Sequence, residues 1–97
     1  MRAEGRRLAS GCLVANWRLL ATGARSRVGV ISSGSLGPAV ARNRARRLLR
    51  EAFRRHQHEL AQPVDLVLIA RHSILGKRLA EVERDFLNAL RKAKLCN

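Results

Sequence analysis

The residues of this chain best suited to chemistry are the arginines crowded between residues 42 and 55. A guanidinium group keeps its charge at any physiological pH and can bind phosphate through two parallel hydrogen bonds. On a helical wheel, the apolar residues of this stretch share one arc and most arginines lie on the other side. The arginines on that other side are Arg44, Arg46, Arg47, Arg50, Arg54 and Arg55.

The sign of this charge is nearly uniform, because Glu51 is the one acidic residue of the stretch. Arginines three or four residues apart, such as Arg46 and Arg50, repel each other by about a few tenths of a kcal/mol. We therefore expect an external anion to bind there, the alternative being a solvated face without a partner. Arg42 and Asn43 lie near the helix start, where free N–H groups favour phosphate. Arg42, at the edge of the apolar stripe, is expected to point toward a ligand.

The amino-acid composition indicates which class of partner this chain binds. Among the 97 residues, Lys and Arg total 20 against 7 acidic residues, a net charge of +13, and all but Lys77, Lys92 and Lys94 of the 20 are arginines. Repulsion among so many like charges opposes folding unless a polyanion relieves it. Nucleic acid is the first candidate, and an anionic membrane the second. The membrane is disfavoured because the arginine helix has many alanines where a membrane helix needs bulky apolar anchors.

Other features of the sequence indicate the domain organisation and the cellular compartment of the protein. The 46% of hydrophobic residues predicts one globular domain over residues 1–97, with residues 1–7 frayed. No targeting segment is visible, and the longest apolar run, 66–70, is too short to span a bilayer. Cys12 and Cys96 have no metal-binding spacing, which predicts free thiols and a cytoplasmic protein.

The expected elements before the arginine helix are two strands. Residues 11–20 alternate loosely between apolar and polar side chains, and residues 28–31 are β-rich. Gly37-Pro38 then opens the helix, because a proline loses nothing at the first helical position.

The helix is expected to end near Gln62-Pro63. A buried strand at 64–70 and a final helix from about residue 73 follow. The order β-β-α-β-α predicts an α+β fold, in which the strands flanking the first helix are parallel neighbours joined by a crossover.

No catalytic constellation is visible. The sequence shows no nucleophile–base pair, and no carboxylates cluster beside the arginines. His56 and His58 are two residues apart on a helix and so do not share a face, and they predict no metal site. The chemistry of this chain is therefore expected to be binding.

The central motif resembles the signature of the bacterial ribonuclease P protein component, without a gap from Arg27 to Arg54. The residues that carry the resemblance are Arg27-Val28-Gly29, Ser33, Gly37, Ala39-Val40, Arg42-Asn43-Arg44, Arg46-Arg47, Arg50-Glu51 and Phe53-Arg54. The weaker likeness on either side extends over nearly the whole chain.

The resemblance implies a two-layer sandwich, a mixed sheet packed by helices, in which the arginine helix is a left-handed crossover. It also implies an accessory subunit of an endoribonuclease that removes the 5′ leader from precursor tRNA. The RNA subunit performs the hydrolysis with bound Mg²⁺, and the protein supplies no catalytic residue, metal site or other cofactor. The partners would be that catalytic RNA and precursor tRNA, with no membrane and no small-molecule substrate.

The resemblance also implies roles for individual residues. A cleft between the sheet and an N-terminal helix holds the leader in this family, and the candidates here are Asn16, Trp17 and Ser35. The residues expected to bind RNA are Arg42, Asn43, Arg44, Arg46, Arg47, Arg50, Arg54, Arg27, Ser33 and Arg71.

Three of these residues keep a second interpretation. Trp17 could stack on a leader base or belong to the core. Ser33 could donate a hydrogen bond to RNA or cap a turn. Arg71 could contact RNA or extend to solvent.

Three departures from the family pattern leave a second function open. Gly34 and Ser35 replace two family lysines, and Asn16 aligns with an expected aromatic residue, with Trp17 one position off. The chain begins almost where the family's N-terminal helix ends. The alternative function is therefore a non-catalytic, ribosomal-type RNA-binding module that has lost leader binding.

Overall fold

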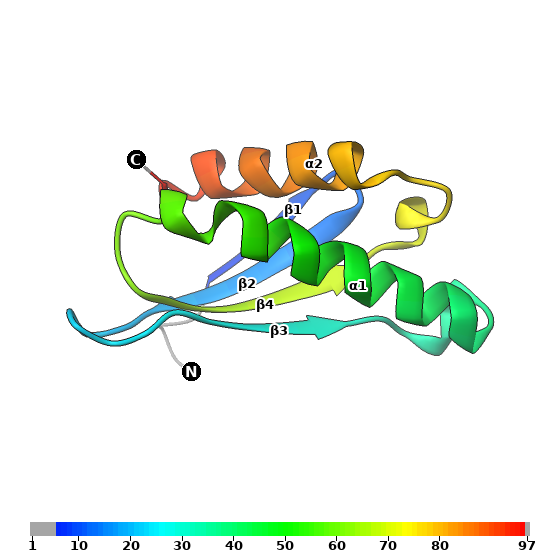
Figure 1. Ribbon diagram of the computed structural model, residues 1–97, viewed down its shortest axis with the longest axis horizontal. Helices are drawn as coiled ribbons and strands as arrows, with labels where there is room; N and C mark the ends of the chain where they lie inside the picture. Colours follow the sequence, from blue (N-terminus) through cyan, green and yellow to red (C-terminus); the bar gives the residue numbers. More distant parts are fainter. Residues whose placement is uncertain (1–5, 97) are drawn as a thin grey trace.

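The computed structural model describes residues 6–96. The helices and strands are, in order, β1 (Arg6–Ser10), β2 (Leu13–Leu19), β3 (Arg27–Ile31), α1 (Ala39–His56), β4 (Val64–Ala70) and α2 (Leu79–Lys92), with short 3-10 turns η1 (Gly34–Leu36), η2 (Gln57–Glu59) and η3 (His72–Ile74). The four strands form one mixed sheet in the order β1-β2-β4-β3, and both helices cover the same face of it (Figure 1). The expected two-layer α+β sandwich is confirmed.

The pairing of the strands follows from the connections between them. β1 and β2 form an antiparallel hairpin, β2 pairs antiparallel with β4, and β4 pairs parallel with β3. A parallel pair needs a crossover between its strands, and α1 supplies it. The predicted parallel neighbours are confirmed, whereas the left-handed sense of the crossover stays a prediction.

Strand β1 is the element that the sequence did not predict. Arg6 and Arg7, expected to be frayed, belong to it, while residues 1–5 lie outside the described residues. Its residues carry little β-signal, since Leu8 is the one large apolar side chain among them. The strand forms because Gly11, at φ +54°, allows the tight turn into β2. Charged side chains on such an edge strand also discourage pairing with another chain.

Both helices are shorter than predicted. α1 ends at His56, ahead of Gln62-Pro63, because the chain needs η2 and a short loop to reach the start of β4. The final helix begins at Leu79, later than residue 73, after η3 and the turn at Gly76, where φ is +80°. At its start the backbone N–H of Arg78 donates to Glu81 Oε1 at 2.9 Å, which satisfies one of the free N–H groups there.

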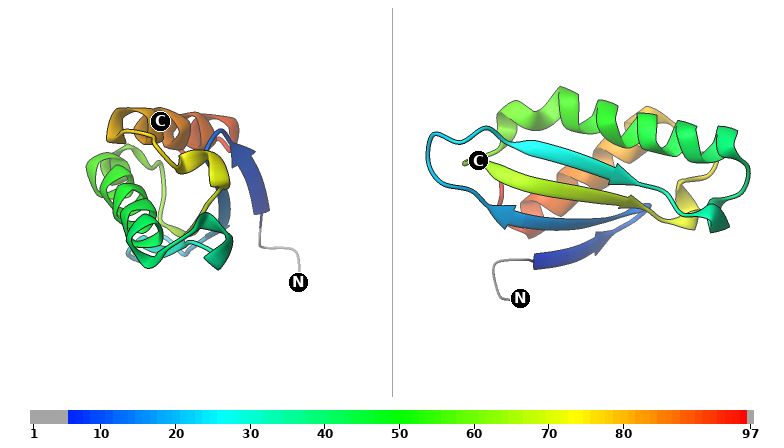
Figure 2. Two further views of the ribbon diagram at one scale, coloured as in Figure 1. Left: turned by 90° about the vertical axis from the view of Figure 1, so that its right-hand side faces the viewer. Right: turned by 90° about the horizontal axis from the view of Figure 1, so that it is seen from below.

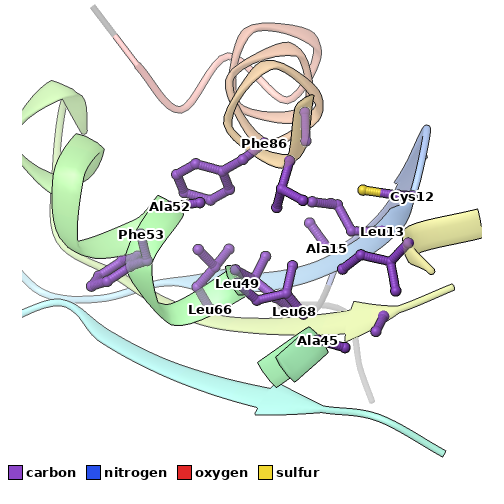
Figure 3. Close-up of a cluster of buried hydrophobic side chains, with 14 of the residues drawn as sticks. Cys12, Leu13, Ala15, Ala45, Leu49, Ala52, Phe53, Leu66, Leu68 and Phe86 are labelled. Atoms are coloured by element: carbon purple, nitrogen blue, oxygen red, sulfur yellow. The ribbon is translucent and has the colours of Figure 1, made fainter. Parts of the chain in front are cut away.

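One apolar core lies between the sheet and the helices (Figure 3). Along β4, Leu66 and Leu68 face this core and are fully buried, while the alternate residues Asp65, Val67 and Ile69 face the opposite side. The rings of Phe53 and Phe86 join α1 to α2 edge-on, with centroids 6.5 Å apart and planes at 65°. The packing of α1 against this core turns its arginines outward, toward solvent.

Candidate nucleic-acid interface

The outward side of α1 carries the arginines, as the helical wheel predicts. Arg44, Arg47, Arg50, Arg54 and Arg55 are exposed, whereas Arg42 and Arg46 are half-buried. Exposure alone does not make these side chains equivalent, because their partners differ along the helix.

The first half of α1 holds arginines whose partners are uncharged. Arg46 Nη1 donates to Ser32 Oγ at 2.7 Å, and its Nη2 donates to Asn43 Oδ1. Arg44 Nη2 donates to the Lys77 carbonyl at 2.9 Å. These contacts orient the guanidinium groups and leave their positive charge in place. No sequence pattern singles out Ser32, because its contact with Arg46 depends on how the loop after β3 folds.

Arg42 uses one of its guanidinium nitrogens within the chain. Its Nη1 donates to the carbonyl of Gly37 at 2.7 Å, and its own carbonyl accepts from Ser32 Oγ at 3.3 Å. Its side chain therefore turns back onto the loop that leads into the helix. The helical wheel did not predict this contact, since it places a residue on a helix without showing the loop beside it, and the RNA-binding role of Arg42 stays a prediction.

Two arginines in the middle of α1 have neither kind of partner. Among residues 6–96, Arg47 and Arg50 make no side-chain hydrogen bond and no ion pair. Both guanidinium groups are free to bind an external anion. We call Arg42, Arg44, Arg46, Arg47 and Arg50 the α1 cationic face, since none of the five pairs with a carboxylate in the described chain.

The last turns of α1 are neutralised. Glu51 pairs with Arg54 and, at 3.4 Å, with Arg55. Its hydrogen bond from Arg54 lowers the pKa of the Glu51 carboxyl below its usual value. Arg55 also lies 3.4 Å from Glu83 of α2. Arg54, predicted to bind RNA, is thus occupied by a carboxylate, and its role stays a prediction.

The sheet face away from the helices is a second exposed surface, seen in the right-hand view of Figure 2. Arg27 and Arg18 both donate to Asp65 Oδ2, at 3.0 and 3.3 Å. In the next row across the sheet, Arg7 Nη1 lies 3.5 Å from Asn16 Oδ1. This surface therefore places Arg27 and Asn16 in neighbouring rows and keeps a net positive charge.

The three candidates for a leader cleft do not come together. Asn16 lies on the open sheet face, but Trp17 follows it in the same strand and so packs on the helix side against the core. Ser35 lies in η1 beyond the end of β3, where its hydroxyl is 2.6 Å from that of Ser33. Asn16 and Trp17 are separated because neighbours in a strand point to opposite faces, and the role of the three residues in leader binding stays a prediction.

Ser33 and Arg71 lie at the edge of the sheet where α1 begins, since the parallel strands β3 and β4 end there. Arg71 Nη1 donates to the Gly11 carbonyl at 3.2 Å, and its backbone N–H donates to the Cys12 carbonyl at 2.9 Å. Arg71 thus fastens the β1–β2 turn, a contact that neither sequence interpretation included. Its RNA-binding role stays a prediction.

The titratable groups outside these surfaces serve packing. Burial, with Asp85 nearby, raises the pKa of the Cys12 thiol to about 12, which keeps it protonated. His56 links the helices, with Nδ1 2.7 Å from Glu59 Oε2 and Nε2 3.1 Å from Glu83 Oε2. Within residues 6–96 no three His, Cys, Asp or Glu side chains gather closely enough to hold a metal ion. In the same residues no helix has both the length and the apolar composition to cross a membrane.

Comparison with known proteins identifies the family. The family model described as Ribonuclease P matches residues 1–94. The chain belongs to the ribonuclease P protein family. The ribonuclease P protein component of Brevibacillus brevis is 38% identical over 69 residues, which span 71% of this chain and 55% of that protein. The component from Clostridium beijerinckii is also 38% identical, over 76% of this chain and 59% of that protein.

Solved structures of the family share the fold. The Staphylococcus aureus RNase P protein superimposes with a TM-score of 0.82 at 27% identity, over 96% of this chain and 84% of that one. The Thermotoga maritima protein gives a TM-score of 0.79 at 29% identity, over 92% of this chain and 84% of that one. The chain shares the fold of these solved structures. It matches less than two thirds of the length of the Brevibacillus brevis and Clostridium beijerinckii proteins.

Proposed function

We propose that the chain is the protein subunit of ribonuclease P and binds the catalytic RNA through the α1 cationic face. The observation that carries the proposal is the set of five arginines without a carboxylate partner, presented by a helix whose other side is held in the core. RNA phosphates can supply the missing counter-charge, and the counterions released on binding favour the complex.

In this proposal the protein assists the removal of the 5′ leader from precursor tRNA, and the RNA performs the hydrolysis. Both RNAs are polyanions that repel each other, and a subunit with a net charge of +13 lowers that repulsion. Magnesium ions enter the reaction as ions of the RNA subunit. The protein's own residues bind and orient: Ser32 and Asn43 hold Arg46, while Arg47 and Arg50 remain free for phosphate.

One observation favours the alternative, an RNA-binding module that has lost leader binding. Asn16 takes the place on the open sheet face where the family carries an aromatic residue, and Trp17 points away from that face. A leader base would therefore find no aromatic ring there to stack on.

Reconstitution tests the two functions together. The chain is added to a bacterial ribonuclease P RNA at low magnesium, and cleavage is measured on precursor tRNAs with and without an extended leader. The proposed function predicts faster cleavage than with RNA alone. Binding to the catalytic RNA without faster cleavage would support the alternative, and absence of RNA binding would refute both.

A further inference from the structure

A cavity of about 430 Å³ opens at the end of the sheet, on the helix side and away from the α1 cationic face. Its apolar wall includes Trp17 and Leu19 of β2 and Leu95, which follows α2. Arg6 and Lys94 also line it. A cavity of this size is in the range of small-ligand sites, which are about 300–1,000 Å³.

Arg6 and Trp17 are held as a pair by the sheet. They are directly opposite each other in the β1–β2 ladder, so their side chains project to the same face. Trp17 is half-buried and keeps part of its indole open to the cavity. The cavity thus combines an aromatic surface with a cation on the same face of the sheet.

Lys94 supplies the second cation from an unusual backbone position. It follows the end of α2 at φ +60°, the left-handed conformation that Gly usually occupies after a helix. Two hydrogen bonds close this helix end, from Lys94 N to the Arg91 carbonyl at 3.1 Å and from Leu95 N to the Leu90 carbonyl at 2.9 Å. Among the described residues Lys94 is the one non-glycine residue with positive φ. Such strain persists where the surroundings or a function require that side chain.

The described residues do not balance the positive charges at this cavity. Among residues 6–96, neither Arg6 nor Lys94 lies in an ion pair with a carboxylate. The occupant that fits is a molecule with a flat ring for Trp17 and an anionic group for the two cations.

We propose that this cavity binds one nucleotide of unpaired RNA, with its base against Trp17 and its phosphate between Arg6 and Lys94. The proposal rests on the proposed function in taking RNA as the ligand. The site is separate from the open sheet face, since β2 directs Asn16 to that face and Trp17 to the opposite one.

The single tryptophan of the chain makes the site directly measurable. Binding of a short unpaired oligoadenylate is followed by the anisotropy of an end label, and Trp17 emission is recorded in parallel. A stacked base is expected to quench Trp17 as the oligonucleotide saturates the protein. Inorganic tripolyphosphate, which has charge and no base, should leave the emission unchanged. Saturation by the oligonucleotide with unchanged Trp17 emission would overturn the proposal.

Lys94 allows a test that does not depend on a damaged fold. Lys94→Gly should raise the melting temperature, because glycine adopts positive φ without strain. Lys94→Gln should weaken oligonucleotide binding about tenfold or more, the effect of one lost hydrogen bond to a charged group. It should also flatten the log–log salt dependence by about 0.7, the effect of one phosphate contact on a single strand.

The matched control is Lys92→Gln. It removes the same charge two residues earlier in the chain, from a side chain that does not line the cavity. Equal weakening by Lys92→Gln and Lys94→Gln would reduce the effect to net charge and overturn the proposal.

The RNA that supplies the nucleotide is identified in the assembled complex. Quenching of Trp17 by the catalytic RNA alone assigns the site to that subunit, and quenching that requires a leader-bearing precursor assigns it to the leader. Quenching in neither complex would overturn the proposal. Absence of cleavage stimulation would contradict the proposed function. It would not affect the oligonucleotide measurements, which test the cavity on its own.

Discussion

The division of α1 into an unpaired and a neutralised half can be tested with two matched double variants. Arg47→Gln with Arg50→Gln removes two arginines that have no partner in the described chain. Arg54→Gln with Arg55→Gln removes two arginines from the same helix that pair with Glu51. Each variant lowers the net charge by two, so any difference between them reflects the position of the charge.

The size of the effect follows from the number of phosphate contacts. Five contacts by the α1 cationic face predict a log–log slope of the binding constant against salt of about −3.5 to −4.5. Loss of Arg47 and Arg50 should flatten this slope by about 1.4 to 1.8. Over an approximately fourfold rise in salt, the first variant should then lose about tenfold less affinity than the wild type.

The assay is filter binding to the catalytic RNA at a series of salt concentrations, with circular dichroism as a check of folding. Arg54→Gln with Arg55→Gln should change the slope far less, because those charges are already countered by Glu51 and Glu83. Equal flattening in both double variants would refute the division of the helix. An unchanged slope in the first variant would place the RNA contacts elsewhere.

Further predictions concern Arg46, the core and the thiol. Ser32→Ala removes the hydroxyl that accepts from Arg46 at 2.7 Å and donates to the Arg42 carbonyl at 3.3 Å. It should weaken RNA binding about fivefold in filter binding, as for one hydrogen bond, with circular dichroism as the check that the fold is intact. Phe86→Ala empties a fully buried site beside Phe53. It should lower the free energy of unfolding in urea by about 3–5 kcal/mol. A decrease below about 1 kcal/mol would contradict the packing. The pKa of Cys12 is raised from 9.0 to about 12, so the folded state holds the thiol proton more tightly than the unfolded state does. The resulting contribution to the free energy of unfolding is complete below pH 9 and is lost as the pH rises toward 12. The loss is measurable as a falling urea midpoint. At pH 8 iodoacetamide should leave Cys12 unmodified while the fold is intact, and rapid alkylation there would contradict its burial.

Much of the site was visible in the sequence because it depends on local spacing. The helical period sorted α1 into an apolar stripe and an arginine side, and the structure buries Ala45, Leu49, Ala52 and Phe53 as that stripe requires. The strand at Val64–Ala70 has the predicted bounds. Such patterns are local, since a residue's face in a helix or strand follows from its position along that element.

Partners that meet across the fold could not be predicted from spacing. Arg55 finds Glu83 on α2, Arg18 and Arg27 share Asp65 from different strands, and Arg46 finds Ser32 in the loop before its helix. These contacts decide which guanidinium groups keep an uncompensated charge. Strand β1 was missed for a similar reason, because its few apolar residues become a strand only when β2 pairs with them.

The sequence by itself determined that this chain has a helix with arginines on one side and that its signature resembles one family of RNA-binding subunits. Only the tertiary structure decided that Arg47 and Arg50 are free while Arg54 and Arg55 are neutralised. It also placed Trp17 beside Arg6 and Lys94 and not on the open sheet face. The physical reason is that charge compensation and cavity formation depend on distances between side chains, and packing sets those distances between residues far apart in the sequence.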